Sequence, residues 1–135
     1  MLITRTDIKC REDVELLVNT FYEKVKKNSI IGPIFNELIN VNWEKHLPIM
    51  YSFWGSLLLG EQSYQGNPML KHIELSKKVS LTEKEFTAWL ELFNETVDEL
   101  FVGERAEEAR KRASNIARLM LYKIENAPIA KPEIP

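Results

Sequence analysis

The sequence predicts an all-α fold, on three observations. Apolar residues recur at intervals of three and four through four long stretches, which is the spacing of one buried face on a helix. Residues typical of helix starts and stops separate these stretches. No segment shows a clear strand-like alternation of apolar and polar residues. At 135 residues, the chain is long enough for one helical core and too short for two domains.

The first predicted helix ends near residue 27. Its apolar stripe consists of Val14, Leu17, Val18, Phe21, Tyr22 and Val25. Asp7 is the expected cap of its start, and Asn28 followed by Gly32-Pro33 ends it. A short helical turn or two is expected next, over residues 34–39.

The second long stripe covers residues 43–58 and stops at Gly60. Pro48 lies inside it, and proline is tolerated in the first turn of a helix or at a kink. Either the helix begins near Leu47, which places Pro48 in the first turn, or it bends at Pro48. In both cases His46 lies beside an irregular part of the helix.

A short helix is predicted after the polar loop at residues 61–67. Asn67 and Pro68 are typical of an N-cap followed by proline in the first turn, and the helix that they open carries His72. Its apolar neighbours are Leu70, Ile73 and Leu75.

Two further long helices complete the predicted bundle. Thr82 and Glu85 have the spacing of a capping box, and the helix that they open ends at Gly103. The last helix carries small residues that would allow a neighbouring helix to approach closely: Ala106, Ala109, Ala113 and Ala117. Residues 1–126 are therefore expected to form one domain. Residues 127–135, with three prolines, are expected to be a disordered tail.

Composition excludes several classes of protein. A net charge of −2 and a pI of about 5.8 give no electrostatic reason to expect a nucleic-acid or anionic-membrane partner. No apolar run is long enough to span a bilayer, and no signal peptide is visible. The single cysteine, Cys10, excludes an internal disulfide. We therefore expect a soluble protein of the cytoplasm.

The two histidines, His46 and His72, are the residues most informative about function. Both lie in segments rich in apolar residues. His72 has no acidic partner on its helix face, and a neutral imidazole in apolar surroundings suits an axial bond to haem iron. A lone histidine is more often a hydrogen-bonded core residue, and that interpretation stays open on the residues alone. Ligand pairs of a non-haem metal site and a hydrolase nucleophile elbow are both absent from the sequence.

Five segments make the chain resemble the truncated haemoglobins, and within them group III. In order, they are Phe21-Tyr22-Glu23-Lys24-Val25, Ile31-Gly32-Pro33-Ile34-Phe35, His46-Leu47-Pro48 with Phe53-Trp54, Gly66-Asn67-Pro68 with His72, and Trp89-Leu90-Glu91-Leu92-Phe93. The resemblance covers about residues 10–124. The chain has no Gly-Gly pair, which the first two groups typically carry at helix junctions. The resemblance implies a globin-like, two-over-two helical sandwich.

The resemblance also implies a haem site. His72 corresponds to the proximal ligand of the iron in heme b. Three residues correspond to the distal, ligand-binding side: Tyr22, His46 and Trp89. Three aromatic residues correspond to those that pack on or near the porphyrin: Phe35, Phe53 and Trp54. By their spacing alone, Phe53 and Trp54 are equally well explained as core residues, and for Phe93 the core is the preferred interpretation.

The function implied is binding of O2, and of other diatomic ligands such as NO or CO, at ferrous haem iron. Tyr22 and Trp89 would each donate a hydrogen bond worth about 1.5–3 kcal/mol to the partly negative ligand. Two such bonds would slow the release of O2, and slow release suits oxygen transport badly. His46 is expected to be a third donor or a gate. Two alternatives stay open: a haem-dependent redox enzyme that handles nitric oxide or peroxide, with a separate reductase for nitric oxide, and a cofactor-free helical interaction module.

Overall fold

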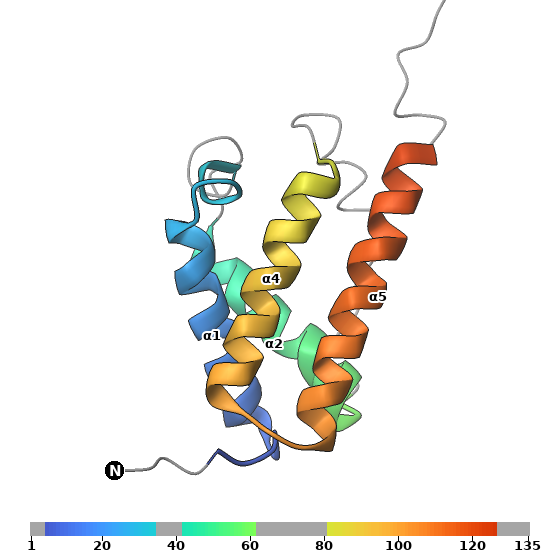
Figure 1. Ribbon diagram of the computed structural model, residues 1–135. Coiled ribbons are helices and arrows are strands. Elements are labelled where there is room, and N and C mark those ends of the chain that lie inside the picture. Colours follow the sequence, from blue (N-terminus) through green and yellow to red (C-terminus); the bar gives the residue numbers. More distant parts are fainter. Residues whose placement is uncertain (1–4, 35–41, 62–80, 127–135) are drawn as a thin grey trace, which may run out of the picture.

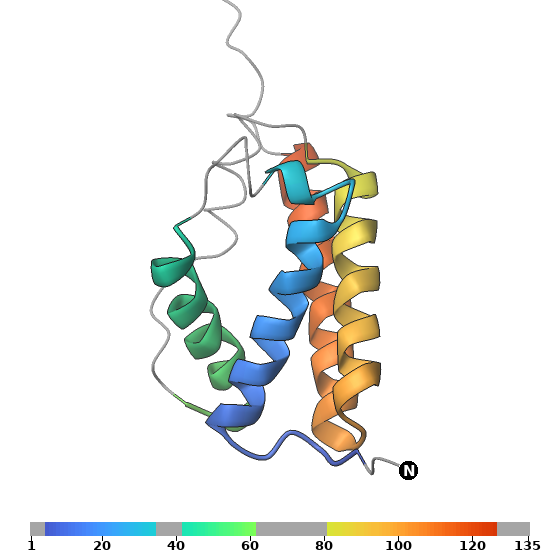
Figure 2. The same ribbon diagram turned by 90° about the vertical axis from the view of Figure 1, so that its left-hand side faces the viewer.

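The computed structural model describes residues 5–34, 42–61 and 81–126. In these ranges it contains α1 (Arg11–Lys27), α2 (Trp43–Leu59), α4 (Glu83–Leu100) and α5 (Glu104–Asn126), which confirms the predicted all-α fold. In Figure 1, α1, α4 and α5 run side by side and α2 lies behind them. Figure 2 shows α1 between α2 and α4, so that α1 and α2 form one pair and α4 and α5 the other.

Several predicted segments lie outside the described residues. Helical backbone is present at residues 32–34, so it begins before the turn expected over residues 34–39, and residues 35–39 of that turn lie outside. The short helix around His72 and the tail at 127–135 also lie outside. In the described ranges, none of the helices is long and apolar enough to cross a membrane.

The predicted apolar stripes form the core. The α1 stripe is buried along its whole length: Val14, Leu17, Val18, Phe21, Tyr22 and Val25. Ala106, Ala109 and Ala113 of α5 are fully buried, and these small side chains let α4 pack closely along α5. Phe93 of α4 is 1% exposed, so its assignment to the core is confirmed.

The ends of α2 and α4 show which boundary signals the chain uses. The Thr82 backbone N–H donates to the Glu85 carboxylate at 2.7 Å, as the predicted capping box requires. Asn42 accepts from the Lys45 backbone N–H at 3.4 Å and caps α2, which therefore begins at Trp43. The alternative start near Leu47 is wrong, and Pro48 lies inside α2, where it has no N–H to complete the helical hydrogen-bond ladder.

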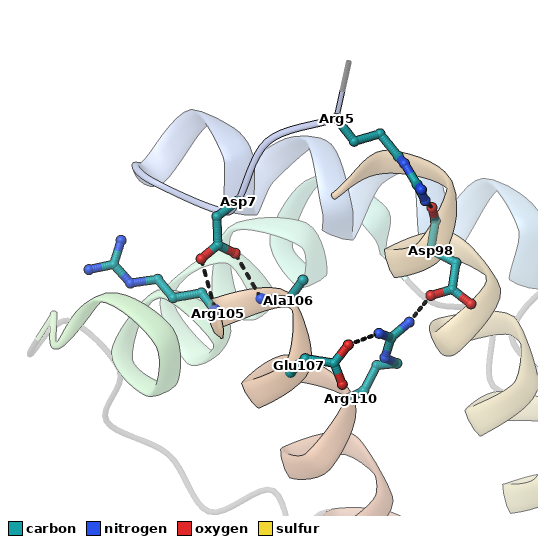
Figure 3. Close-up of polar contacts among 7 residues, drawn as sticks. All are labelled: Arg5, Asp7, Asp98, Arg105, Ala106, Glu107 and Arg110. Atoms are coloured by element: carbon teal, nitrogen blue, oxygen red, sulfur yellow. Dashed lines mark hydrogen bonds and ion pairs between the residues drawn. The ribbon is translucent and has the colours of Figure 1, made fainter. Parts of the chain in front are cut away.

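Asp7 caps α5, and its predicted role as the cap of α1 is wrong. The N-cap of α1 is Cys10, whose side chain makes no capping hydrogen bond. The Asp7 carboxylate instead accepts from the backbone N–H groups of Arg105 and Ala106, each at 2.9 Å (Figure 3). These are two of the N–H groups that the first turn of α5 leaves without a helical partner.

Gly103 explains why α5 takes its cap from a distant residue. It immediately precedes α5 and has no side-chain oxygen to offer. A Cβ on Gly103 would lie 2.5 Å from Cγ of Asp7, so glycine leaves the space that the carboxylate occupies. Nearby, Arg110 pairs with Glu107 and Asp98 (Figure 3). The N-terminal segment and the α4–α5 junction are therefore joined at one end of the bundle.

Asp7→Ala is expected to lower the free energy of unfolding by about 1–2 kcal/mol, the typical cost of losing an N-cap. Urea unfolding followed by circular dichroism measures the loss. Glu104→Ala is the matched control, because Glu104 is an exposed acid in the same first turn and contributes only through the helix dipole. Equal losses in the two variants would mean that Asp7 acts by charge alone.

The Asp7 cap also predicts a pH dependence. Burial tends to raise the pKa of Asp7, but hydrogen bonds from the backbone of Arg105, Ile8 and Ala106 outweigh it and leave the pKa lowered. A lowered folded pKa means that the contribution is complete above the unfolded value of about 3.9 and is lost as pH falls through the folded value. Asp7→Asn should therefore flatten the acid side of the stability profile, and an unchanged slope would contradict this.

Candidate functional site

A largely apolar cavity lies among the four helices. It holds about 890 Å³ of space not filled by protein atoms, its open side included. Of this space, the volume that water-sized molecules could occupy is about 120 Å³. The residues that line it are Tyr22, Ile31, Ile34, His46, Met50, Phe53, Trp54, Leu81, Glu85, Phe86, Trp89, Ile116, Ala117 and Met120.

The cavity brings together most of the site residues that the sequence predicted. Five of them lie on its wall although they come from three different helices: Tyr22, His46, Phe53, Trp54 and Trp89. The other two, Phe35 and His72, lie outside the described residues. His72 belongs to the segment that joins α2 to α4, and both of these helices line the cavity.

Tyr22 and His46 form a polar pair on the wall. Tyr22 projects from α1 and is 7% exposed. Its hydroxyl lies 3.3 Å from Nε2 of His46 on α2, and the tautomer of His46 sets which of the two atoms donates. Burial raises the pKa of Tyr22, so the hydroxyl keeps its proton at neutral pH and can donate a hydrogen bond.

Trp89 is a second donor, held by the core. Its ring stacks on Phe93 at 5.8 Å with an interplanar angle of 13°. The ring of Phe21 packs edge-on against Trp89 at 5.8 Å. Among the residues that the structure describes, none accepts a hydrogen bond from the Trp89 indole N–H. The indole is therefore fixed in orientation while its N–H stays available to a ligand.

Phe53 and Trp54 supply aromatic wall from α2. Trp54 is 4% exposed and stacks on Phe93 at 4.7 Å, so it belongs to the core as well as to the cavity wall. Phe53 is half-buried and packs edge-on against Trp54 at 5.4 Å. The core interpretation and the cofactor interpretation of these two residues are therefore compatible.

Comparison with known proteins identifies the family. The sequence model of the bacterial-like globins matches residues 7–122. The group 3 truncated haemoglobin of Campylobacter jejuni is 36% identical over 119 residues, which cover 84% of this chain and 91% of that protein. The crystal structure of a group III truncated haemoglobin from the same organism matches with a TM-score of 0.78 at 30% identity, over 90% of this chain and 95% of that one.

The chain belongs to the group III truncated haemoglobins. The resemblance found in the sequence and the two-over-two globin fold that it implied are both confirmed. Membership makes this truncated haemoglobin a haem-binding globin, and it disfavours the cofactor-free interaction module.

The cavity of this truncated haemoglobin fits a haem by its own chemistry. Its wall is nearly all aliphatic and aromatic, as the flat apolar face of a porphyrin requires, with few polar groups. Within the described ranges, no group of three or more His, Cys, Asp or Glu side chains could hold a bare metal ion. The apolar wall suits the face of a porphyrin ring. Met50, Phe53 and Trp54 on one helix and Ile116 and Met120 on another would hold that ring.

Some of this wall was missed in the sequence. Ile116, Ala117 and Met120 of α5 line the cavity, and helical spacing alone cannot separate such a wall from a core. Glu85 was assigned only to a cap. Burial tends to raise the pKa of Glu85, but hydrogen bonds from Thr82 lower it overall. The carboxylate is therefore charged and serves the start of α4 while it lies at the cavity wall.

Proposed function

We propose that this truncated haemoglobin holds heme b through His72 and binds O2, with NO and CO as alternative ligands. The observation that carries the proposal is the presence of Tyr22, His46 and Trp89 on one apolar cavity, with the Tyr22 hydroxyl 3.3 Å from His46. When bound, the haem supplies an iron atom that takes up the diatomic ligand. Phe35, Phe53 and Trp54 would pack on or near the porphyrin.

The residues of the chain would hold the ligand by hydrogen bonding in a dry site. A diatomic ligand with partial negative charge accepts from the Tyr22 hydroxyl and the Trp89 indole N–H, each bond being worth about 1.5–3 kcal/mol. The apolar wall excludes water that would compete for these donors and strengthens both bonds. We therefore propose slow O2 release.

Slow release favours tight binding or redox chemistry over oxygen transport. The same donors would polarise a bound peroxide, so peroxide or nitric oxide chemistry is the second candidate. Turnover with nitric oxide would need electrons from a separate reductase. The predicted cytoplasmic location is compatible with such a reductase partner.

An absorption spectrum tests the cofactor directly. The purified protein should be coloured, its pyridine haemochrome should have the bands of heme b, and the reduced protein should give a stable oxygenated spectrum in air. A colourless protein that takes up no added haem would refute the proposal. Rapid oxidation without an oxygenated form would favour the redox candidate.

His46→Ala is expected to speed ligand entry more than it changes ligand loss. His46 is half-buried and lies close to Pro48, where α2 lacks a helical hydrogen bond, so the backbone that carries it is less restrained than at Tyr22 and Trp89. Flash photolysis of the CO complex should show an association rate that is raised by more than the dissociation rate changes. Faster O2 loss with unchanged entry would instead make His46 a direct donor.

A further inference from the structure

Trp43 contacts two polar residues of the cavity wall, Tyr22 and His46, and does not line the cavity itself. It is the first residue of α2 and is half-buried. Its ring centroid lies 5.3 Å from that of Tyr22 and 5.7 Å from that of His46. The Tyr22 and His46 rings are themselves 5.2 Å apart, so the three rings form a closed cluster in which each contacts the other two.

Lys26 holds the Trp43 ring from α1. Its Nζ lies 4.8 Å from the centroid of that ring, within the range of a cation–π contact. The same ammonium lies 3.2 Å from the carboxylate of Glu23, one turn earlier on α1. The Glu23 carboxylate thus steadies the cation, and the cation ties the last turn of α1 to the first turn of α2.

We propose that Trp43 is a positioning residue for the Tyr22–His46 pair, and that the Lys26 ammonium fixes Trp43 in that place. The ring of Trp43 packs against His46, so His46 loses part of the packing that restrains it when Trp43 is removed. Without Trp43, the two side chains would adopt several arrangements, of which the hydrogen-bonded one is only one. The expected change in ligand kinetics rests on the proposed function. The expected change in the arrangement of Tyr22 and His46 does not.

The first measurement is ¹⁵N NMR of the His46 imidazole in the haem-loaded, ferrous CO complex, which is diamagnetic. With only two histidines in the chain, His46→Ala identifies the His46 signals. The unchanged protein should give one set of His46 signals, and Trp43→Ala should split or shift them. Trp43→Phe, which keeps an aromatic ring, should restore most of the original spectrum.

The second measurement is the CO association rate, with the CO stretching band recorded on the same samples. Trp43→Ala should change the rate by about tenfold, since two aromatic contacts are lost. Lys26→Met should change it by roughly two- to fivefold, the factor that corresponds to one exposed cation–π contact. Lys26→Arg keeps the cation and should behave as the unchanged protein does.

Tyr51→Ala is the matched control. Tyr51 also lies on α2, is half-buried and has a cation from α1, Arg11, 6.0 Å from its ring. Its hydroxyl bonds to Asn19, and it does not line the cavity. Loss of this second aromatic–cation pair should lower thermal stability without altering the His46 signals or the CO stretching band.

The outcomes separate the two claims. Unchanged His46 signals in both Trp43→Ala and Lys26→Met would overturn the positioning role. Equal changes in Tyr51→Ala would also overturn it, because they would show general loosening of α2. Altered His46 signals with unchanged CO kinetics and CO stretching band would uphold the positioning role and instead refute the proposed contact of this pair with the ligand. If Trp43→Ala does not fold, Lys26→Met and Trp43→Phe decide the question.

Discussion

His72→Gly is expected to abolish stable haem binding, and added imidazole should restore it. The variant removes the proposed bond between imidazole and iron but leaves space for a free imidazole in its place. Loss of groups that merely support a metal ligand lowers affinity by about 10- to 100-fold, so loss of the ligand itself should cost more. Haem content after gel filtration, with and without imidazole, measures the effect.

His46→Gly is the control, because the chain has only these two histidines. It removes an imidazole from the wall of the same cavity and should leave haem content unchanged. If His72→Gly keeps a normal histidine-ligated spectrum while His46→Gly loses haem, the two assignments must be exchanged. Retention of haem by both variants would mean that neither histidine is required to hold the iron.

Tyr22→Phe and Trp89→Phe should each raise the O2 dissociation rate by about tenfold or more, since each removes one hydrogen bond of roughly 1.5–3 kcal/mol. Both substitutions keep an aromatic ring that packs against its neighbours, so the variants should still fold. Stopped-flow displacement of O2 by CO measures the rate. The O2 dissociation rate of the double variant should exceed that of either single variant. If its change in activation free energy is smaller than the sum of the two single changes, the two donors are coupled.

Tyr51→Phe is the matched control for the loss of a hydroxyl. The Tyr51 hydroxyl bonds to Asn19 at 2.5 Å, away from the cavity wall, so its removal should leave O2 dissociation unchanged. Unchanged dissociation in both Tyr22→Phe and Trp89→Phe would place the distal donors elsewhere in the chain. A change in Tyr51→Phe equal to theirs would show an indirect effect through helix packing.

Much of the fold was predictable because helix signals are local. The stripe of α1 and the capping box of α4 were identified from residues that lie within a few positions of one another. Gly60, which has a positive φ of 74°, ends α2 where the sequence placed its end. Such features depend on the chemistry of one turn and need no knowledge of the neighbouring helices.

One error in the sequence prediction involves groups that are far apart in the chain. Asp7 is of a residue type that often caps helices, but the groups it caps are the N–H groups of Arg105 and Ala106, which no local sequence pattern connects to it. Pro48 was compatible with two helix starts, and Asn42 decided between them by capping α2 at Trp43. Capping rules state which residue types can accept a hydrogen bond from a helix end. Which helix end supplies the N–H donor depends on the tertiary structure.

The sequence alone determined the helical class, because residue type and helical spacing are local properties. Its resemblance to the truncated haemoglobins indicated the family and the five cavity residues Tyr22, His46, Phe53, Trp54 and Trp89. Only the tertiary structure decided that Tyr22 meets His46, that Trp43 contacts both, and that Ile116 and Met120 of α5 are wall. The physical reason is that periodicity defines which face of a helix is apolar, whereas the packing of helices against one another defines what that face meets.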